Sequence, residues 1–196
     1  GVYWVAHRST PELLLRSFSR AMSKVMPGAP AEFTFESWEA ALEHIFRLDK
    51  HLEPPSRPVV VLDEFPYLIQ SAPEVASLLQ KHWDQRAPDS RVVLALCGSH
   101  YQMMQDQVLS PRQPLFGRST ASMLVEEVPP AEIGLFLPRY SAAQIVETYS
   151  VVGGVPKYLE MWDDRVPVLR NIRQQVLSPV SMFRHEALFL IQDELA

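Results

Sequence analysis

Short apolar runs alternate with amphipathic stretches through the first half of the chain. Three runs, at residues 1–6, 59–62 and 91–97, are rich in valine, leucine and other apolar side chains and have the length of buried strands. Because the run at 59–62 is wholly apolar, we expect it to be covered on both faces of a sheet. Strand, helix and strand joined by short links predict an α/β fold, a parallel sheet flanked by helices.

Helical periodicity fills the intervals between these strands. Apolar side chains recur at helical spacing over residues 11–26, 37–50 and 73–85. Thr10 stands directly before Pro11, and a hydroxyl cap followed by proline in the first turn is typical of a helix start. Each of these ranges is therefore predicted to be a helix.

The second half of the chain is mainly helical. The pattern predicts a helix over residues 100–109, a proline-rich loop over 110–118 and a last strand over 122–126. Beyond residue 130 only helices are predicted, at residues 141–151, 158–162, 166–177 and 181–195. We therefore divide the chain into an α/β core at 1–129 and a helical lid subdomain at 130–196.

Composition and charge narrow the class of protein. The 196 residues carry a formal net charge of −5, which gives no general attraction to nucleic acid or to an acidic membrane surface. No stretch approaches the roughly 18 apolar residues of a membrane span. Cys97 is the single cysteine, so an internal disulfide is excluded, and we expect a cytoplasmic protein. The chain opens with a strand-like run and without methionine, which suggests a fragment that begins inside a domain.

Candidate chemistry begins at Asp63 and Glu64, directly after the apolar run at 59–62. Open α/β sheets bind ligands at the carboxyl ends of their strands, where this acid pair is predicted to lie. In phosphoryl transfer, Asp63 would hold magnesium through its water shell, and Glu64 would orient and deprotonate the attacking water. The alternative is structural, because an acidic pair can simply cap the loop or helix that follows.

Two further polar positions follow along the chain. Ser99 comes after the next strand, where its hydroxyl can contact a γ-phosphate or the attacking water, or can cap a helix. Arg118 follows Gly117, and its guanidinium can pair with phosphate oxygens or lie on the surface without a partner. Asp63, Glu64 and Ser99 are expected at one edge of the sheet.

The chain carries four motifs in order: VVVLDEFPYL at 59–68, LCGS at 96–99, PLFGR at 114–118 and VGGVPKYL at 152–159. Together they resemble the archaeal-type ATPase family, a branch of the P-loop NTPases related to the AAA+ and STAND ATPases. The resemblance covers nearly the whole chain, and the combination is more specific than any single motif. It implies that Asp63 and Glu64 correspond to the Walker B acids, Ser99 to the sensor position and Arg118 to the Gly-Arg motif. It also implies ATP and Mg²⁺ as cofactors.

One departure from the family is large. The phosphate-binding loop of such proteins ends in Gly-Lys-Ser/Thr, and none of the seven glycines here is followed by lysine. By the resemblance, that loop would lie upstream of Gly1, and its strand would sit between the strand ending at Cys97 and the strand near Met123. We therefore expect the chain alone to bind ATP very weakly.

Two hypotheses on function follow. The first is an ATP-hydrolysing switch or motor, of which this chain is the part carrying the Walker B and sensor elements. The second is a degenerate α/β interaction module that binds protein or DNA without hydrolysis. The convergence of acids, hydroxyl and arginine favours the first. A further C-terminal domain is common in the family, so a protein or DNA partner bound through it and an oligomeric state are open possibilities.

Overall fold

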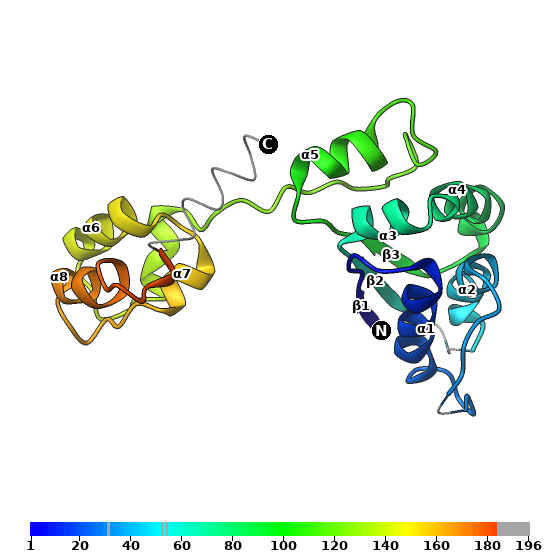
Figure 1. Cartoon of the computed structure of the whole chain (residues 1–196), viewed down its shortest axis with the longest axis horizontal. Helices are drawn as coiled ribbons and strands as arrows, with labels where there is room; N and C mark the ends of the chain where they lie inside the picture. Colours follow the sequence, from blue (N-terminus) through cyan, green and yellow to red (C-terminus); the bar gives the residue numbers. More distant parts are fainter. Residues whose placement is uncertain (31, 52, 54, 184–196) are drawn as a thin grey trace. The chain divides into compact units, whose positions relative to one another are not determined.

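The computed structural model describes residues 1–30, 32–51, 53 and 55–183 of the chain (Figure 1). It forms two compact units, Gly1–Ser122 and Met123–Ala196. This division falls seven positions before residue 130, where the sequence pattern turns wholly helical. Each unit has its own hydrophobic core.

Unit 1 is built on a parallel sheet of three strands. The strands are β1 (Val2–Val5), β2 (Val59–Asp63) and β3 (Val93–Leu96), in the spatial order β1-β2-β3. Val5 is paired with Asp63, and Leu62 with Leu96, so the carboxyl ends of the strands lie at one edge. The predicted parallel α/β arrangement is confirmed.

Helices connect the strands, and most begin where the sequence indicates. Thr10 caps the first helix through a hydrogen bond from the Leu13 amide, and Ser37 caps the second through the Ala40 amide. The sequence pattern does not predict the short helix α3 (Phe65–Ser71) after β2, because no run of polar residues separates the strand from the helix there. The helices of unit 1 are α1 (Pro11–Ser23), α2 (Trp38–Ile45), η1 (Leu48–His51), α3 (Phe65–Ser71), α4 (Glu74–Arg86), η2 (Ala87–Asp89), α5 (Tyr101–Met104) and η3 (Gln105–Leu109).

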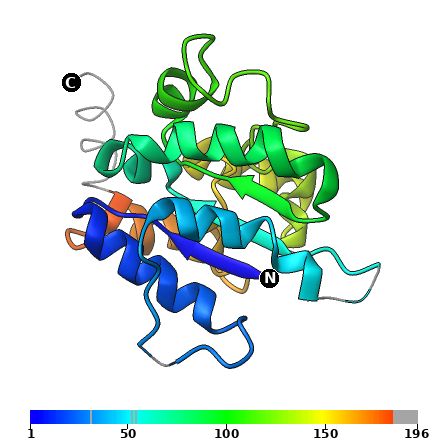
Figure 2. The ribbon, with the colours of Figure 1, turned by 90° about the vertical axis from the view of Figure 1, so that its right-hand side faces the viewer.

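The core of unit 1 lies between the sheet and the helices on one side of it. Phe18 of α1 packs edge-on against Trp4 of β1, with ring centroids 5.3 Å apart, and also contacts Trp38 of α2 at 5.6 Å. Figures 1 and 2 show α1, α2 and α4 gathered on this side of the strands. Side chains of alternate strand positions point into this layer, including Val60 and Leu62, which are almost fully buried.

The prediction that β2 is covered on both faces is wrong. Exposure alternates along the strands, and the second face carries Tyr3 at 64% exposure, with Val5, Val59 and Val93 each at 42%. Strand side chains alternate between faces, and no element of unit 1 in the described residues packs on this one. We call the set Tyr3, Val5, Val59, Val61, Asp63, Val93 and Ala95 the open face of the sheet.

The prediction of a strand at 122–126 is also wrong. The backbone there pairs with no strand, and Met123 and Val125 are 84% and 81% exposed. An extended apolar segment becomes a strand only where a neighbour supplies backbone hydrogen bonds, and the described residues provide none for it.

Unit 2 is helical in its described part, as the sequence predicts. Ser141 forms a capping box with Gln144 at the start of α6. Gly153 ends that helix at φ 65°, and Pro156 opens the next one, in agreement with the gap between the helices predicted at 141–151 and 158–162. The predicted helix at 181–195 lies largely outside the described residues. The elements are η4 (Pro130–Leu135), α6 (Ala142–Val152), α7 (Pro156–Glu160), α8 (Val168–Asn171) and η5 (Ile172–Val176).

Candidate functional site

The acid pair lies where β2 turns sharply into α3. Glu64 has φ 52° and ψ 40°, and it is the only described residue other than glycine with positive φ. Residues other than glycine rarely adopt this left-handed backbone conformation, which costs about 1–2 kcal/mol for a residue such as glutamate. The Phe65 amide donates to the Cys97 carbonyl at 2.8 Å, and the Cys97 amide donates to Leu62 at 3.0 Å, so β3 holds the strained turn in place.

This turn brings Glu64 to the polar end of the neighbouring strand. The Ser99 amide nitrogen lies 3.5 Å from Glu64 Oε2, a long hydrogen bond across the edge of the sheet. Asp63 is the last residue of β2, and Ser99 follows β3 by three positions. The two acids and Ser99 therefore share the carboxyl edge of the sheet, as the sequence predicts.

Asp63 is held by two donors. Its Oδ1 accepts the Glu64 amide at 2.9 Å, and its Oδ2 accepts the hydroxyl of Tyr3 from β1. This hydrogen bond from a neutral phenol to a carboxylate raises the pKa of Tyr3, because losing the proton would place two negative charges side by side. Burial, and then the nearby Asp63 carboxylate, raise the pKa of the Cys97 thiol.

Sequence reasoning missed Tyr3. Its position opposite Val61 in the register puts it diagonally across from Asp63 on the open face. The signal was present in the alternation of β1, but only the register of β1 against β2 shows which side chain reaches the acid. A phenol two residues before a strand end is otherwise a common surface residue.

Ser99 and its neighbour do not cap the next helix through their side chains. His100 is the residue before α5, and no side-chain hydrogen bond caps that helix. Ser99 is exposed, so the hydroxyl is accessible at the edge of the sheet. The predicted role of this hydroxyl toward a phosphate or water stays a prediction.

The structure engages Arg118 with α4. Its Nε and Nη2 each donate to the Asp84 carboxylate at 2.8 Å, and Nη1 donates to the carbonyls of Pro114 and Phe116. None of these bonds reaches residues 63, 64 or 99. Arg118 therefore fastens the 110–118 loop in this state, and a phosphate contact would require the ion pair with Asp84 to open.

The donor set suits magnesium with most of its water shell retained. Mg²⁺ is commonly held by one or two carboxylates, with waters and substrate phosphates filling the other positions. Asp63 and Glu64 provide two carboxylates at one edge, and the described residues contain no group of three or more acids, histidines or cysteines that would form a closed metal cage. Asp63 therefore fits as one protein ligand of a metal whose other positions are filled by waters and a phosphate ligand.

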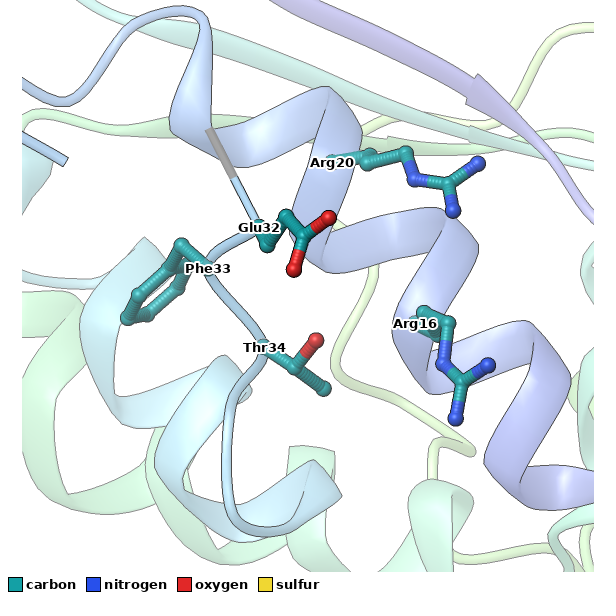
Figure 3. A pocket seen from close by; sticks show the side chains of 5 residues that line it. All are labelled: Arg16, Arg20, Glu32, Phe33 and Thr34. Atoms are coloured by element: carbon teal, nitrogen blue, oxygen red, sulfur yellow. The ribbon is translucent and has the colours of Figure 1, made fainter. Parts of the chain in front are cut away.

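Two pockets lie away from the carboxyl edge of the sheet. A pocket of about 330 Å³ on α1 is lined by Arg16, Arg20, Glu32, Phe33 and Thr34, and none of the predicted site residues takes part in it (Figure 3). A second groove of about 580 Å³ runs beside β3. Its apolar wall includes Phe46, Trp83, Val92 and Leu94.

Comparisons with known proteins define the class of fold. The Walker-type ATPase PABY2304 of Pyrococcus abyssi has a solved structure that matches 99% of this chain with a TM-score of 0.67 and 17% sequence identity. The chain therefore has a P-loop ATPase-like α/β fold. It spans 62% of that ATPase.

Sequence relatives lie in the archaeon Methanocaldococcus jannaschii. The uncharacterized protein MJECL04 is 32% identical over 180 residues, which are 92% of this chain but 38% of that protein. The uncharacterized protein MJ0424 is 32% identical over 78 residues, which are 40% of this chain and 76% of that protein. The chain belongs to the same family as MJ0424. No family model matches the chain.

No helix in the described ranges is long and apolar enough to cross a membrane.

Proposed function

We propose that this chain is part of an ATP-binding and ATP-hydrolysing core of the archaeal-type ATPase family. The observation that carries the proposal is the Glu64 turn, which places its carboxylate 3.5 Å from the Ser99 amide at the carboxyl edge of a parallel sheet. A left-handed glutamate is costly, and such strain is concentrated at functional sites. The Glu64 side chain makes no hydrogen bond that caps α3, so capping does not explain the residue.

Each residue has a distinct part in the proposed reaction. Asp63 binds the water shell of a Mg²⁺ ion that neutralises charge on the transferred phosphoryl group. Glu64 orients the attacking water and accepts its proton. The Ser99 hydroxyl contacts the water or the γ-phosphate, and Arg118, once released from Asp84, contacts phosphate or a neighbouring protein.

In this proposal, the phosphate-binding loop is supplied by a segment outside these 196 residues. Two features of unit 1 support such a segment. The outer edge of β3 has no strand partner in the described residues: the Val93 and Cys97 amides face β2, so by alternation the amides of Leu94 and Leu96 point outward, beside the apolar groove of about 580 Å³. No described helix of unit 1 covers the open face. A strand and a helix carrying the loop would supply both.

The first experiment measures nucleotide binding by the chain alone. We expect labelled ATP to bind more weakly than micromolar, because the backbone amides and lysine that cradle phosphates are absent from this sequence. Micromolar binding would show that residues of this chain hold the phosphates without that loop, and the proposal would have to be abandoned in this form.

The second experiment restores the segment encoded upstream of Gly1 and compares ATP turnover with that of Glu64→Gln. The variant keeps the size of the side chain and loses its basicity, so we expect retained ATP binding and loss of hydrolysis. The matched control is Glu74→Gln at the start of α4, away from the acid pair. Equal turnover in the wild type and Glu64→Gln would favour the alternative, an interaction module that binds protein or DNA without hydrolysis.

The remaining parts of the proposal concern the whole protein. Unit 2 would act as the helical lid of the ATPase, and a cytoplasmic location fits the single cysteine. A protein or DNA partner would bind through a further domain, and assembly into an oligomer would bring Arg118 of one copy to the nucleotide of another.

A further inference from the structure

The two neighbouring acids are directed to opposite neighbours of β2. Glu64 reaches toward β3, where its Oε2 meets the Ser99 amide. Asp63 is bound on the other side, where the Tyr3 hydroxyl of β1 donates to Oδ2. Because β2 is the central strand of the sheet, these contacts separate the two carboxylates.

Both oxygens of Asp63 are engaged in this arrangement. Oδ1 accepts the Glu64 amide at 2.9 Å, a contact within the turn itself, whereas Oδ2 is held by a side chain from another strand. Tyr3 and Asp63 lie on the open face, and the Tyr3 side chain is 64% exposed, so no packing prevents the phenol from moving away. Tyr3 is thus a removable restraint.

We propose that Tyr3 is a positioning residue that holds the Asp63 carboxylate on the β1 side of the sheet, and that a divalent cation at Asp63 competes with this hydrogen bond. The inference rests on the proposed function, in which Asp63 holds the metal. In this inference, the Tyr3 hydrogen bond opposes cation binding. A bound cation would break the bond and move the Asp63 carboxylate toward Glu64 and Ser99.

The competition has a simple physical basis. A donated hydrogen bond occupies a lone pair of Oδ2 and stabilises its negative charge, which reduces the affinity of that oxygen for a cation or for a metal-bound water. Removing the phenolic O–H should therefore strengthen cation binding by about threefold to tenfold, the range expected for the net free energy of one hydrogen bond. The phenyl ring of phenylalanine keeps the sheet contact.

The test uses Mn²⁺ as the probe on the whole 196-residue chain. Paramagnetic broadening of the amide signals of residues 63, 64 and 99 gives the dissociation constant in the wild type and in Tyr3→Phe. Tyr101→Phe, at an exposed tyrosine of α5, is the matched control, and Asp63→Asn tests whether binding depends on the acid. Thermal unfolding of each variant verifies that it is folded.

We expect Tyr3→Phe to bind Mn²⁺ about threefold to tenfold more tightly than wild type, and Tyr101→Phe to match wild type. Equal or weaker binding by Tyr3→Phe, with binding still lost in Asp63→Asn, would overturn the role of Tyr3 and leave the proposed function standing. Binding that is unchanged in Asp63→Asn would overturn both, because Asp63 would not be the metal ligand.

Discussion

Arg118 and Asp84 form a two-point ion pair, with both nitrogen-to-oxygen distances at 2.8 Å. The pair joins the 110–118 loop to α4, and Arg118 also donates to the Pro114 carbonyl at 2.9 Å, so one side chain ties the loop at several points. Because Nε and Nη2 are both engaged by the Asp84 carboxylate, the phosphate contact proposed for this guanidinium would require the ion pair to open.

Replacing Arg118 with lysine should loosen this loop. Lysine keeps the charge but cannot make two parallel hydrogen bonds to one carboxylate. We expect faster amide hydrogen exchange at residues 115–118, with exchange elsewhere in unit 1 unchanged. Arg112→Lys, at an exposed arginine of the same loop, is the control. If both variants exchange like wild type, the ion pair does not order the loop.

The same contact should respond to acid. Arg118 lowers the pKa of Asp84 below its ordinary value of 3.8, chiefly through the hydrogen bond. The protection of the loop is therefore present above pH 3.8 and is lost as pH falls through the lowered pKa. Hydrogen exchange of the loop, measured down a pH series and corrected for intrinsic rates, would follow this course in wild type and be flat in Asp84→Asn.

His82 should make the unit 1 core sensitive to mild acid. Its side chain is only 3% exposed, its ring stacks on Phe46, and neither ring nitrogen has a hydrogen-bond partner within the described residues. Burial, with the positive charges of Arg86 and Lys81, lowers the pKa of His82, and Glu43 and Glu39 oppose this only in part. Between the lowered pKa and the ordinary pKa of His82, the unfolded chain therefore binds a proton at this residue and the folded chain does not.

The sign of the effect follows from that difference. The stability contributed by neutral His82 is complete above its ordinary pKa of 6.5 and declines as pH falls through the lowered pKa. Urea denaturation should show that the wild type has a lower free energy of unfolding at pH 5.5 than at pH 7.5. This difference should be smaller in His82→Leu. His7→Leu, at an exposed histidine, should behave like wild type. An identical pH dependence in His82→Leu would refute this assignment.

Gly154 is required by a close backbone approach in unit 2. A Cβ at this position would lie 2.0 Å from the Val128 carbonyl oxygen, and the Val128 amide donates to the Gly154 carbonyl at 2.9 Å. Gly154→Ala should destabilise unit 2 by about 2–3 kcal/mol, since backbone cannot move aside as a side chain can. In Gly134→Ala the new Cβ meets only Ile145 Cδ1 at 3.4 Å, so this variant should retain wild-type stability. Equal stability of the two variants in chemical denaturation would contradict the account.

The left-handed backbone at residue 64 should lower the stability of any variant that keeps a side chain there. Glu64→Ala and Glu64→Gly both lose the carboxylate, but glycine adopts φ 52° without steric cost. We expect Glu64→Gly to be more stable than Glu64→Ala by about 1 kcal/mol. Denaturant unfolding of the two variants measures this difference directly. A more stable Glu64→Ala would show that the turn is not strained.

Much of the fold and part of the site can be predicted from the sequence. The three apolar runs became β1, β2 and β3, and Thr10 and Ser37 cap helices as their chemistry indicates, because strands and caps depend on local patterns. The meeting of Glu64 and Ser99 at one edge follows from parallel pairing alone. Apolar runs do not reveal whether a second layer is present, so the open face and the unpaired backbone at 122–126 were beyond sequence reasoning.

Local sequence determined the strands, the helix starts and the placement of acids at a strand end, since each depends on residues a few positions apart. Only the tertiary structure decided that Tyr3 binds Asp63 and that Arg118 binds Asp84, because these partners are 60 and 34 positions apart in the chain. Such contacts depend on strand register and loop path, which arise from packing the whole unit. The sequence therefore names the reactive groups, and the register decides how each is held.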